Sequence, residues 1–251
     1  MDALRITDEH VIEVRHLRKA FGANQVLNDF NLDLHRGENL MVLGKSGSGK
    51  SVLIKCIVGL LEPDAGGISV LGQDVLALDH EALDRMRVKI GFLFQSSALY
   101  DSMTVQENLE FPLRRHWIER DRVKVDDLVT EVLEAVGLPH TRDMYPSELS
   151  GGMRRRIGLA RTLILKPEIV LYDEPTTGLD PITGKEIVEL ILKLQRTYNT
   201  SSIIISHDLN VAKLAANRII VLVDGKDHAV GTYDELYASN DPKVKPFFIF
   251  M

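Results

Sequence analysis

The chain has 251 residues, of which 45% are hydrophobic, and its formal net charge is −6 at pH 7. This length and apolar content suffice for a substantial core, in one large domain or in a domain with an inserted lobe, while the negative charge argues against general nucleic-acid binding. The one cysteine, Cys56, excludes an internal disulfide and a cysteine metal cluster, and we expect it to be a small buried apolar residue.

The N-terminal part of the chain contains a glycine-rich loop between a predicted strand and a predicted helix. Residues 1–94 alternate apolar strand-like runs, such as 32–34 and 68–71, with turns. The apolar run 40–43 leads into Gly44-Lys45-Ser46-Gly47-Ser48-Gly49-Lys50-Ser51, which matches the pattern G-x-x-x-x-G-K-[ST] in full, and residues 52–57 continue as a helix. The glycines let the backbone turn its N–H groups inward around an anion, and the helix points its positive end at the same place.

We therefore predict that this loop binds the phosphates of a nucleotide. Lys50 would reach the β- and γ-phosphates, and the Ser51 hydroxyl would bind Mg²⁺. The alternative is a flexible glycine turn without a ligand. The strand before the loop and the helix after it favour the phosphate loop, because the motif requires that context.

The pattern changes at residue 96, where strand-like runs give way to helical ones up to residue 165. One helical face ends at Gly137 and Pro139 and consists of Val125, Leu128, Val129, Val132, Leu133 and Val136. A later helix follows the turn Ser150-Gly151-Gly152 and is predicted to cover residues 153–165. Because its first-turn N–H groups lack partners and its dipole end is positive, this turn can bind a γ-phosphate.

Arg154, Arg155 and Arg156 occupy the first turn of this predicted helix, where their charge opposes the helix dipole. The positive charges of these arginines are less unfavourable at the helix start if some of them bind an anion or a neighbouring carboxylate. For most of them we expect a solvated basic face.

Two acidic residues come after the apolar run 169–172, which is typical of a parallel strand buried on both faces. Ligands of open α/β sheets bind at the carboxyl ends of such strands. We predict that Asp173 holds the Mg²⁺ shell and that Glu174 orients or deprotonates the attacking water. The alternative is an acidic pair that ends a strand and caps the next segment, with Pro175 enforcing the turn.

The C-terminal third returns to an alternation of helix and strand. Asp180 and Pro181 suit the start of a helix whose buried stripe is Ile187, Leu190, Ile191 and Leu194. Residues 219–223 form a further buried strand. The tail ends in Phe247, Phe248, Ile249 and Phe250, which either fold back on their own domain or form an exposed patch for a partner.

Taken in order, these motifs resemble those of the ATP-binding cassette family, and the resemblance covers nearly the whole chain. It implies an α/β fold with the phosphate-loop NTPase core of this family, an N-terminal antiparallel β part and an inserted helical subdomain. In one domain of residues 1–251, the core would comprise residues 1–95 and 166–232, the helical subdomain with the signature turn 96–165, and the tail 233–251.

The resemblance also implies a role for each site residue. The expected catalytic residues are Glu174, His207 and Lys50. The expected Mg²⁺ ligands are Ser51, Gln95 and Asp173. The residues expected to contact ATP lie in the phosphate loop and in the other motifs: Phe21, Gly44, Lys45, Ser46, Gly47, Ser48, Gly49, Lys50, Ser51, Val52, Gln95, Ser150, Gly151, Gly152 and Asp180.

Residues outside the phosphate loop are recognised by the family's motif order. Phe21 matches the aromatic that stacks on adenine, and Gln95 the glutamine that senses Mg²⁺ and the transport partner. Asp180 matches the loop that crosses the dimer interface, and His207 the switch histidine at the γ-phosphate. Each residue also has an alternative role. Phe21 could be a core residue, and His207 a histidine with satisfied hydrogen bonds at a strand end. Asp180 could cap a helix, which is compatible with its role at the interface. Met153 stands where the family usually has Gln, but the phosphate contacts come from Ser150 and the glycine amides.

A narrower resemblance, to the ATPases of Mla-type and Mce-associated lipid transport systems, rests on residues 94–113, 149–153 and 180–183. It implies an ATPase dimer that drives a membrane permease, moving phospholipid between envelope membranes with a lipid-binding Mce-type protein and a small regulatory subunit. We expect a cytoplasmic protein held at the inner face of the membrane by its permease, because no apolar run approaches the ~18 residues of a span and residues 1–3 open no signal peptide.

The mechanism expected from the family is an ATP sandwich. Two copies would hold two ATP·Mg²⁺ between the phosphate loop of one copy and the signature turn of the other. A chromosome-maintenance ATPase would need a long coiled coil between Gln95 and Leu149, and this interval is too short. A phosphate-loop kinase or GTPase has no use for the signature turn, and no Asn-Lys-x-Asp run is present. A soluble assembly ATPase, of the kind that serves iron–sulfur scaffold proteins, stays open.

Overall fold

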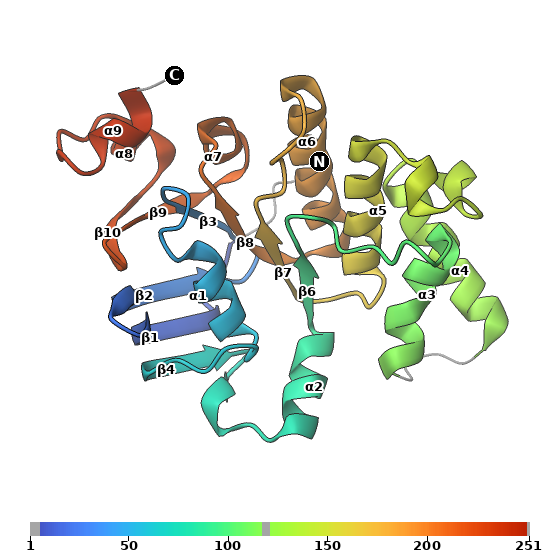
Figure 1. The fold of residues 1–251 in the computed structure, drawn as a ribbon, viewed down its shortest axis with the longest axis horizontal. Helices are drawn as coiled ribbons and strands as arrows, with labels where there is room; N and C mark the ends of the chain where they lie inside the picture. Colours follow the sequence, from blue (N-terminus) through green and yellow to red (C-terminus); the bar gives the residue numbers. More distant parts are fainter. Residues whose placement is uncertain (1–5, 117–120, 250–251) are drawn as a thin grey trace.

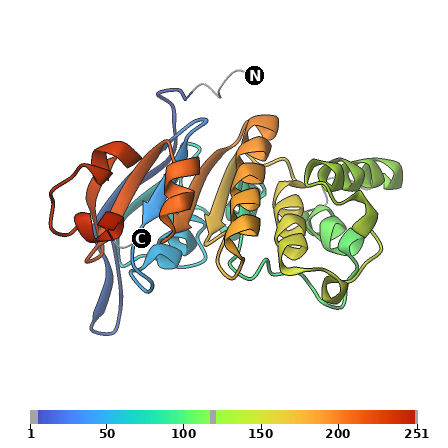
Figure 2. The ribbon, with the colours of Figure 1, turned by 90° about the horizontal axis from the view of Figure 1, so that it is seen from above.

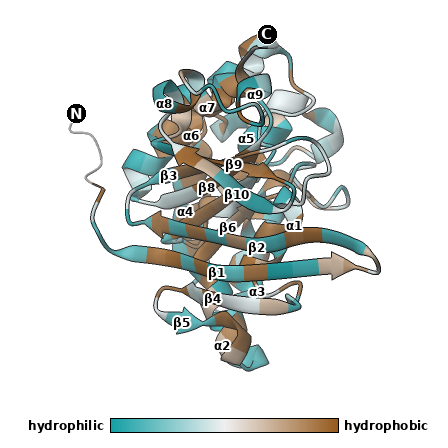
Figure 3. Ribbon diagram, turned by 90° about the vertical axis from the view of Figure 1, so that its left-hand side faces the viewer, coloured by the Kyte–Doolittle hydropathy of each residue, from teal (hydrophilic) through white to brown (hydrophobic). Residues whose placement is uncertain are grey.

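The computed structural model describes residues 6–116 and 121–249, and it contains two β-sheets with helices around them (Figure 1). The first sheet is antiparallel, in the order β2-β1-β4-β5. Its strands are β1 (His10–Phe21), β2 (Asn24–His35), β4 (Ala65–Val70) and β5 (Gln73–Asp74). Along β1 and β2 hydrophobic and hydrophilic residues alternate (Figure 3), as expected of strands that bury one face.

The second sheet has the strand order β10-β9-β3-β8-β7-β6 and is parallel except for β10, which pairs antiparallel with β9. Its strands are β3 (Asn39–Leu43), β6 (Ile90–Leu93), β7 (Ile169–Asp173), β8 (Ser201–Ser206), β9 (Arg218–Val223) and β10 (Lys226–Gly231). Every residue of β3, β7 and β8 is buried, which explains their continuous apolar runs.

Both faces of the parallel sheet are covered, and β3 shows this directly. Leu40 and Val42 pack in the core between the two sheets, together with α1 (Lys50–Ile57), whereas Met41 and Leu43 pack in the core that contains α7 (Leu209–Ala215). Cys56 of α1 is fully buried, as predicted. Helix α2 (His80–Val88) lies below β6 (Figure 1), and α6 (Pro181–Tyr198) runs beside α7 (Figure 2).

Three helices form the end of the molecule remote from β1 and β2 (Figure 2): α3 (Val105–His116), α4 (Arg122–Ala135) and α5 (Gly151–Leu163). Their buried apolar side chains belong to one cluster that also includes Val170 and Tyr172 of β7 and Ile187 of α6. The helical part therefore shares its core with the sheet instead of having one of its own. In the described residues, no helix is both long and apolar enough to cross a bilayer.

The tail folds back on its own domain, which is the first of the two alternatives for it. Helix α8 (Tyr233–Tyr237) and helix α9 (Lys245–Ile249) meet through Phe248, which is 7% exposed and lies edge-on to Tyr233 and Tyr237. Phe247 is half-buried against the same core. Phe250, the last aromatic of the predicted patch, lies outside the described residues.

The predicted fold class is confirmed, with differences at the element boundaries. Helix α5 begins at Gly151 and ends at Leu163, two residues earlier at each end than predicted. Ser150 is its N-cap, so Gly151 and Gly152 belong to its first turn. The short run 32–34 belongs to the longer strand β2, and the run 68–71 overlaps the end of β4, which stops at Val70. The predicted division of the chain into core, helical subdomain and tail stays a prediction.

Candidate functional site

The phosphate loop has a backbone that its glycines make possible. Gly47 and Gly49 have φ angles of 77° and 104°, in the left-handed region. A Cβ on Gly49 would lie 2.6 Å from Val26 Cγ1, and one on Gly44 would lie 2.7 Å from Ser48 Oγ. A side chain at these positions would therefore strain the loop or press on its neighbours, between the buried strand β3 and the first turn of α1.

Lys50 is the first residue of α1 and is 5% exposed. Its Nζ donates hydrogen bonds to the backbone oxygens of Gly44, at 2.8 Å, and Lys45, at 3.0 Å. Nζ also lies 3.6 Å from Glu174 Oε1. Burial lowers the pKa of the Lys50 ammonium, and Glu174 counteracts this. The side chain thus spans the space between the loop and the end of β7.

The two predicted Mg²⁺ ligands Ser51 and Asp173 meet across that space. The Ser51 hydroxyl donates to Asp173 Oδ1 at 3.1 Å. Burial raises the pKa of the Asp173 carboxyl, while the Ser51 hydrogen bond lowers it. A hydroxyl and a partly desolvated carboxylate are oxygen ligands of the kind that Mg²⁺ prefers, so these two residues fit the ion.

Glu174 and His207 also lie together, although 33 residues separate them. Nδ1 of His207 is 3.0 Å from both carboxylate oxygens of Glu174, and the Thr177 hydroxyl donates to Glu174 Oε2 at 3.1 Å. Glu174 adopts a left-handed φ of 49°, a strained conformation for a residue with a side chain. A carboxylate held in this way is poised to accept a proton or to orient a water molecule.

Phe21 is not a core residue, because 51% of it is exposed at the end of β1. The ammonium of Lys19 lies 5.6 Å from the centre of its ring. Lys19 in turn pairs with Asp64 Oδ1 at 2.8 Å, and the other carboxylate oxygen of Asp64 accepts from the Ala20 N–H at 2.6 Å. An exposed aromatic ring with a cation near it is suited to stacking on a nucleobase.

One cavity of about 430 Å³ joins most of these groups. Its lining residues come from β1, β2, the phosphate loop and the ends of the parallel strands: Phe21, Val26, Ser46, Gly47, Gly49, Lys50, Ser51, Val52, Gln95, Glu174, Thr177 and His207. The exposed Gln95 follows β6, so a ligand in this cavity would contact three strand ends of the parallel sheet. Open α/β sheets bind their ligands at such carboxyl ends of parallel strands.

The signature turn does not line this cavity. Ser150 is the N-cap of α5, and its Oγ accepts from the Met153 N–H at 3.2 Å. A Cβ on Gly152 would lie 2.8 Å from Thr183 Cγ2, so the turn packs against the start of α6. Asp180 is the N-cap of α6 and accepts from the N–H groups of Ile182 and Thr183, and it lines a different cavity, beside α7.

The fit of ATP and Mg²⁺ can be tested on the phosphate loop itself. The Ser48 hydroxyl is buried and, among the described residues, has no hydrogen-bond partner. The first turn of α1 has no side-chain cap, so no capping side chain satisfies its N–H groups. A phosphate in the loop would satisfy these donors and would attract the Lys50 ammonium, and the residues present therefore fit a nucleotide.

Arg155 departs from the sequence interpretation. The expectation of a solvated basic face holds for the exposed Arg154, but it is wrong for Arg155, which is 5% exposed. Arg156 pairs with Glu186 at 2.9 Å. Packing of α5 against β6 and α6 turns one of the three arginines inward, which charge patterning alone does not reveal.

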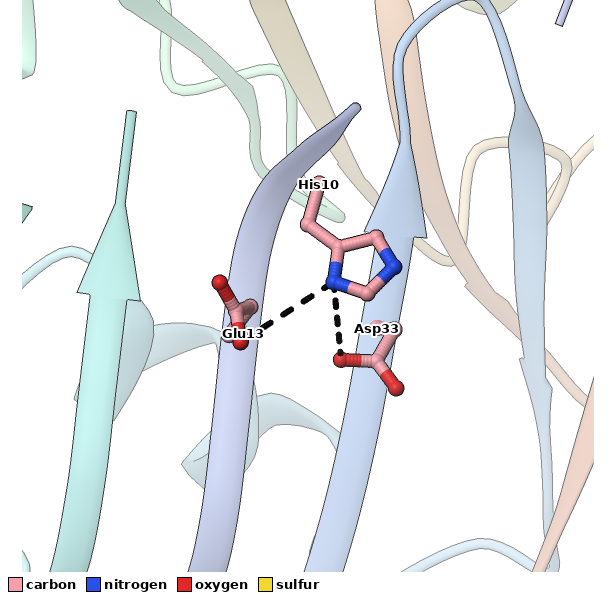
Figure 4. A group of neighbouring side chains, drawn as sticks. All are labelled: His10, Glu13 and Asp33. Atoms are coloured by element: carbon pink, nitrogen blue, oxygen red, sulfur yellow. Dashed lines mark ion pairs between the residues drawn. The ribbon is translucent and has the colours of Figure 1, made fainter. Parts of the chain in front are cut away.

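A separate cluster on the antiparallel sheet was also not expected from the sequence. His10, Glu13 and Asp33 bring three potential ligand atoms within 4.8 Å of one another (Figure 4). The guanidinium Nη2 of Arg15 already lies 3.0 Å from Glu13 Oε2 and 2.5 Å from Asp33 Oδ1. Arg15 supplies the positive charge that a metal would bring, so the cluster is a surface ion-pair network between β1 and β2.

Comparison with known proteins agrees with this geometry. The family model described as ABC transporter matches residues 27–177. The "probable ribonucleotide transport ATP-binding protein mkl" of Mycobacterium leprae is 38% identical over 94% of this chain and 68% of its own length. The "intermembrane phospholipid transport system ATP-binding protein MlaF" of Haemophilus influenzae is 38% identical over 96% of this chain and 90% of its own length.

Among solved structures, the dimeric post-hydrolysis state of the ATP-binding cassette MJ0796, bound to ADP and Pi, superposes with a TM-score of 0.80. It is 31% identical in sequence, and the match covers 88% of this chain and 98% of that one. The predicted roles of the individual site residues stay predictions. Since the family model spans well over half of the chain, and relatives at 38% identity align along nearly all of it, the chain belongs to the ATP-binding cassette transporter family as one of its ATP-hydrolysing subunits.

Proposed function

We propose that two copies of this chain close around two ATP·Mg²⁺ and thereby drive a separate membrane permease. One observation carries the proposal. The cavity has the groups for an adenine ring, a triphosphate and an attacking water, yet the second predicted anion site, Ser150 to Gly152, does not line it. A second copy can supply its own signature turn to the open side of the cavity, which makes the nucleotide part of the dimer interface.

Within one copy, each group has a defined task. The N–H groups of the phosphate loop and Lys50 bind the β- and γ-phosphates, which Lys50 can reach by leaving the loop oxygens that it now contacts. Glu174 orients the attacking water and accepts its proton, and His207 holds the Glu174 carboxylate through Nδ1. Mg²⁺ held by Ser51, Asp173 and Gln95 would neutralise charge on the phosphate oxygens.

The dimer converts hydrolysis into movement. Because the γ-phosphate contributes to the contacts of both copies, ATP favours the closed dimer and its hydrolysis weakens it. Only such a difference in affinity between two states can drive a conformational cycle. Gln95 and the segment 98–105 would pass this movement to the permease, since Gln95 belongs to the cavity and the segment extends from it toward α3.

For the cargo we propose phospholipid. The support is the MlaF relative, which this chain covers almost end to end, and the resemblance of residues 94–113 to lipid-transport ATPases. The expected partners are then a permease, a lipid-binding Mce-type protein and a small regulatory subunit, and the ATPase would lie at the cytoplasmic face of the membrane. The mkl relative, whose name refers to ribonucleotide transport, makes a ribonucleotide the competing cargo.

The test is to purify the native complex from detergent-solubilised membranes and to identify its proteins and its bound small molecules. We expect a polytopic permease, an Mce-type protein and phospholipid in amounts stoichiometric with the complex. If the chain is recovered with a permease and a ribonucleotide, the cargo is a ribonucleotide and not phospholipid. If it is recovered with soluble partners alone, the transport function is contradicted and an assembly ATPase is supported.

A further inference from the structure

Arg155 is a charged side chain buried between three segments of the chain. It lies on the second turn of α5, is 5% exposed, and its pKa is lowered by burial. Its Nη1 donates to the backbone oxygen of Phe94 at 3.1 Å, and its Nη2 to that of Thr177 at 3.2 Å. Both acceptors are neutral carbonyls, so their hydrogen bonds must compensate for much of the cost of desolvating a guanidinium.

The first acceptor lies next to a residue of the nucleotide cavity. Phe94 follows β6 and precedes Gln95, which lines the cavity. After Gln95 the backbone takes the left-handed conformation at Ser97 and Ala98, so its path is tightly determined there. Arg161, further along α5, donates to the Ala98 oxygen at 2.8 Å. The signature helix therefore holds the Gln95 loop at two points.

The second acceptor leads to the proposed catalytic carboxylate. The Thr177 hydroxyl donates to Glu174 Oε2 at 3.1 Å, while the Thr177 N–H donates to the Glu174 backbone oxygen at 3.2 Å. Arg155 fixes the carbonyl of the same residue. Through Thr177, the guanidinium thus helps to position the Glu174 carboxylate, together with His207 and Ser206, which also contact that carboxylate.

We propose that Arg155 is a positioning residue for ATP hydrolysis, which couples the place of the signature helix to both Gln95 and Glu174. The inference rests on the proposed function, because it takes Glu174 as the group that acts on water. A shift of α5 relative to the sheet changes both hydrogen bonds of Arg155 at once. Helix α5 of one copy would contact the nucleotide that its partner holds. Arg155 connects this helix to Glu174 of the same copy.

The experiment compares steady-state ATP hydrolysis and ATP binding in the purified complex for Arg155→Gln, Arg155→Lys and the matched control Arg154→Gln. For Arg155→Gln we expect kcat to fall about 10- to 100-fold, since a misplacement near 1 Å has effects of that size. The ATP dissociation constant should change less than about threefold, because Arg155 does not line the cavity. Arg155→Lys keeps the charge but lacks the two-armed donor, so its kcat should be intermediate. The exposed Arg154 should be replaceable without loss.

Thr177→Val provides an independent route, because it removes the hydroxyl and leaves the backbone carbonyl for Arg155. It should also lower kcat, and combined with Arg155→Lys the losses should be less than additive, since both act on Glu174. Unchanged kcat in a folded Arg155→Gln protein would overturn the proposal, as would strictly additive losses. A loss of ATP binding equal to the loss of kcat would also contradict it, by making Arg155 a binding residue. Full hydrolysis by Glu174→Gln would instead defeat the proposed function, whatever Arg155 does.

Discussion

The two glycine-rich helix starts of this chain, at α1 and at α5, differ in how much of a nucleotide site each has around it. The start of α1 has no side-chain cap and faces a cavity that already contains Lys50, Ser51 and Glu174. The start of α5 is capped by its own Ser150 and packs on the start of α6. The first is a nearly complete phosphate site, whereas the second has donors but no cavity of its own.

This difference indicates where a second molecule has to act. A site whose cation, hydroxyl and carboxylates come from one chain can bind ATP without help. The start of α5, which has no pocket of its own, can bind a γ-phosphate only when a second molecule brings that phosphate to it. Substitutions at the two helix starts and around them can therefore separate binding by one chain from events that need two.

Glu174→Gln should have the largest effect. The amide cannot accept a proton from water, so we expect the rate of hydrolysis to fall about 10²- to 10⁴-fold while ATP binding persists. The protein should then accumulate as a nucleotide-bound dimer, visible by sedimentation in Mg·ATP. Hydrolysis at the wild-type rate would remove Glu174 from the catalytic role, and an arrested protein that stays monomeric even beside its partners would remove the sandwich.

Gly151→Asp should separate the two helix starts. A Cβ at Gly151 meets only Leu179 Cδ2, at 3.7 Å, so the side chain fits, and an acidic residue suits a helix N-terminus. Its carboxylate would repel a partner's γ-phosphate, so we expect ATP binding to be retained and hydrolysis to fall more than about tenfold. Gly67→Asp, where a Cβ has no neighbour within 4 Å, is the control. Equal activity of both variants would mean that the signature turn meets no phosphate.

Sequence reasoning predicted the backbone correctly where it depends on neighbouring residues. The phosphate loop, its flanking strand and helix, and the acidic end of β7 each depend on fewer than about twenty consecutive residues, and their residue types leave little choice of backbone. Asp180 was expected as a helix N-cap for the same reason, and its hydrogen bonds to Ile182 and Thr183 agree.

The long-range parts could not be predicted. Arg155 is separated from Phe94 by 61 residues, so its burial depends on how α5 packs on the sheet and not on the surrounding arginines. The cluster of His10, Glu13 and Asp33 depends on the register between β1 and β2, and the fold-back of Phe248 depends on α8. Motif order singled out Gln95 and His207, and both line the cavity, but it gave no sign that Arg155 and Arg161 hold the loop around Gln95.

Phe21→Ala addresses the part of the site that one chain supplies. Loss of the exposed ring should raise the dissociation constant of ATP about tenfold, because base stacking contributes roughly 1–3 kcal/mol per base. Competition by inorganic tripolyphosphate, which has no base, should be unchanged. Lys19→Met should weaken ATP binding about two- to fivefold, by removing the cation beside the ring. Weaker binding of tripolyphosphate in either variant would show that the phosphate loop had been disturbed instead.

Asp180→Asn should have the smallest effect, because Asn also caps helices and can accept from the same N–H groups. The hydrogen bonds from Thr183, and to a lesser extent that from Ile182, hold the pKa of the Asp180 carboxyl below its usual value. The stability that Asp180 contributes is therefore present above the pKa of the unfolded chain and is lost as the pH falls through the lowered pKa of the folded protein. We expect equal melting temperatures of the two proteins at pH 7, and a smaller decrease on acidification to about pH 3 for Asp180→Asn. If Asp180→Asn also lowers hydrolysis in the complex at pH 7 without changing the melting temperature, the charge acts across the dimer interface in addition to capping α6.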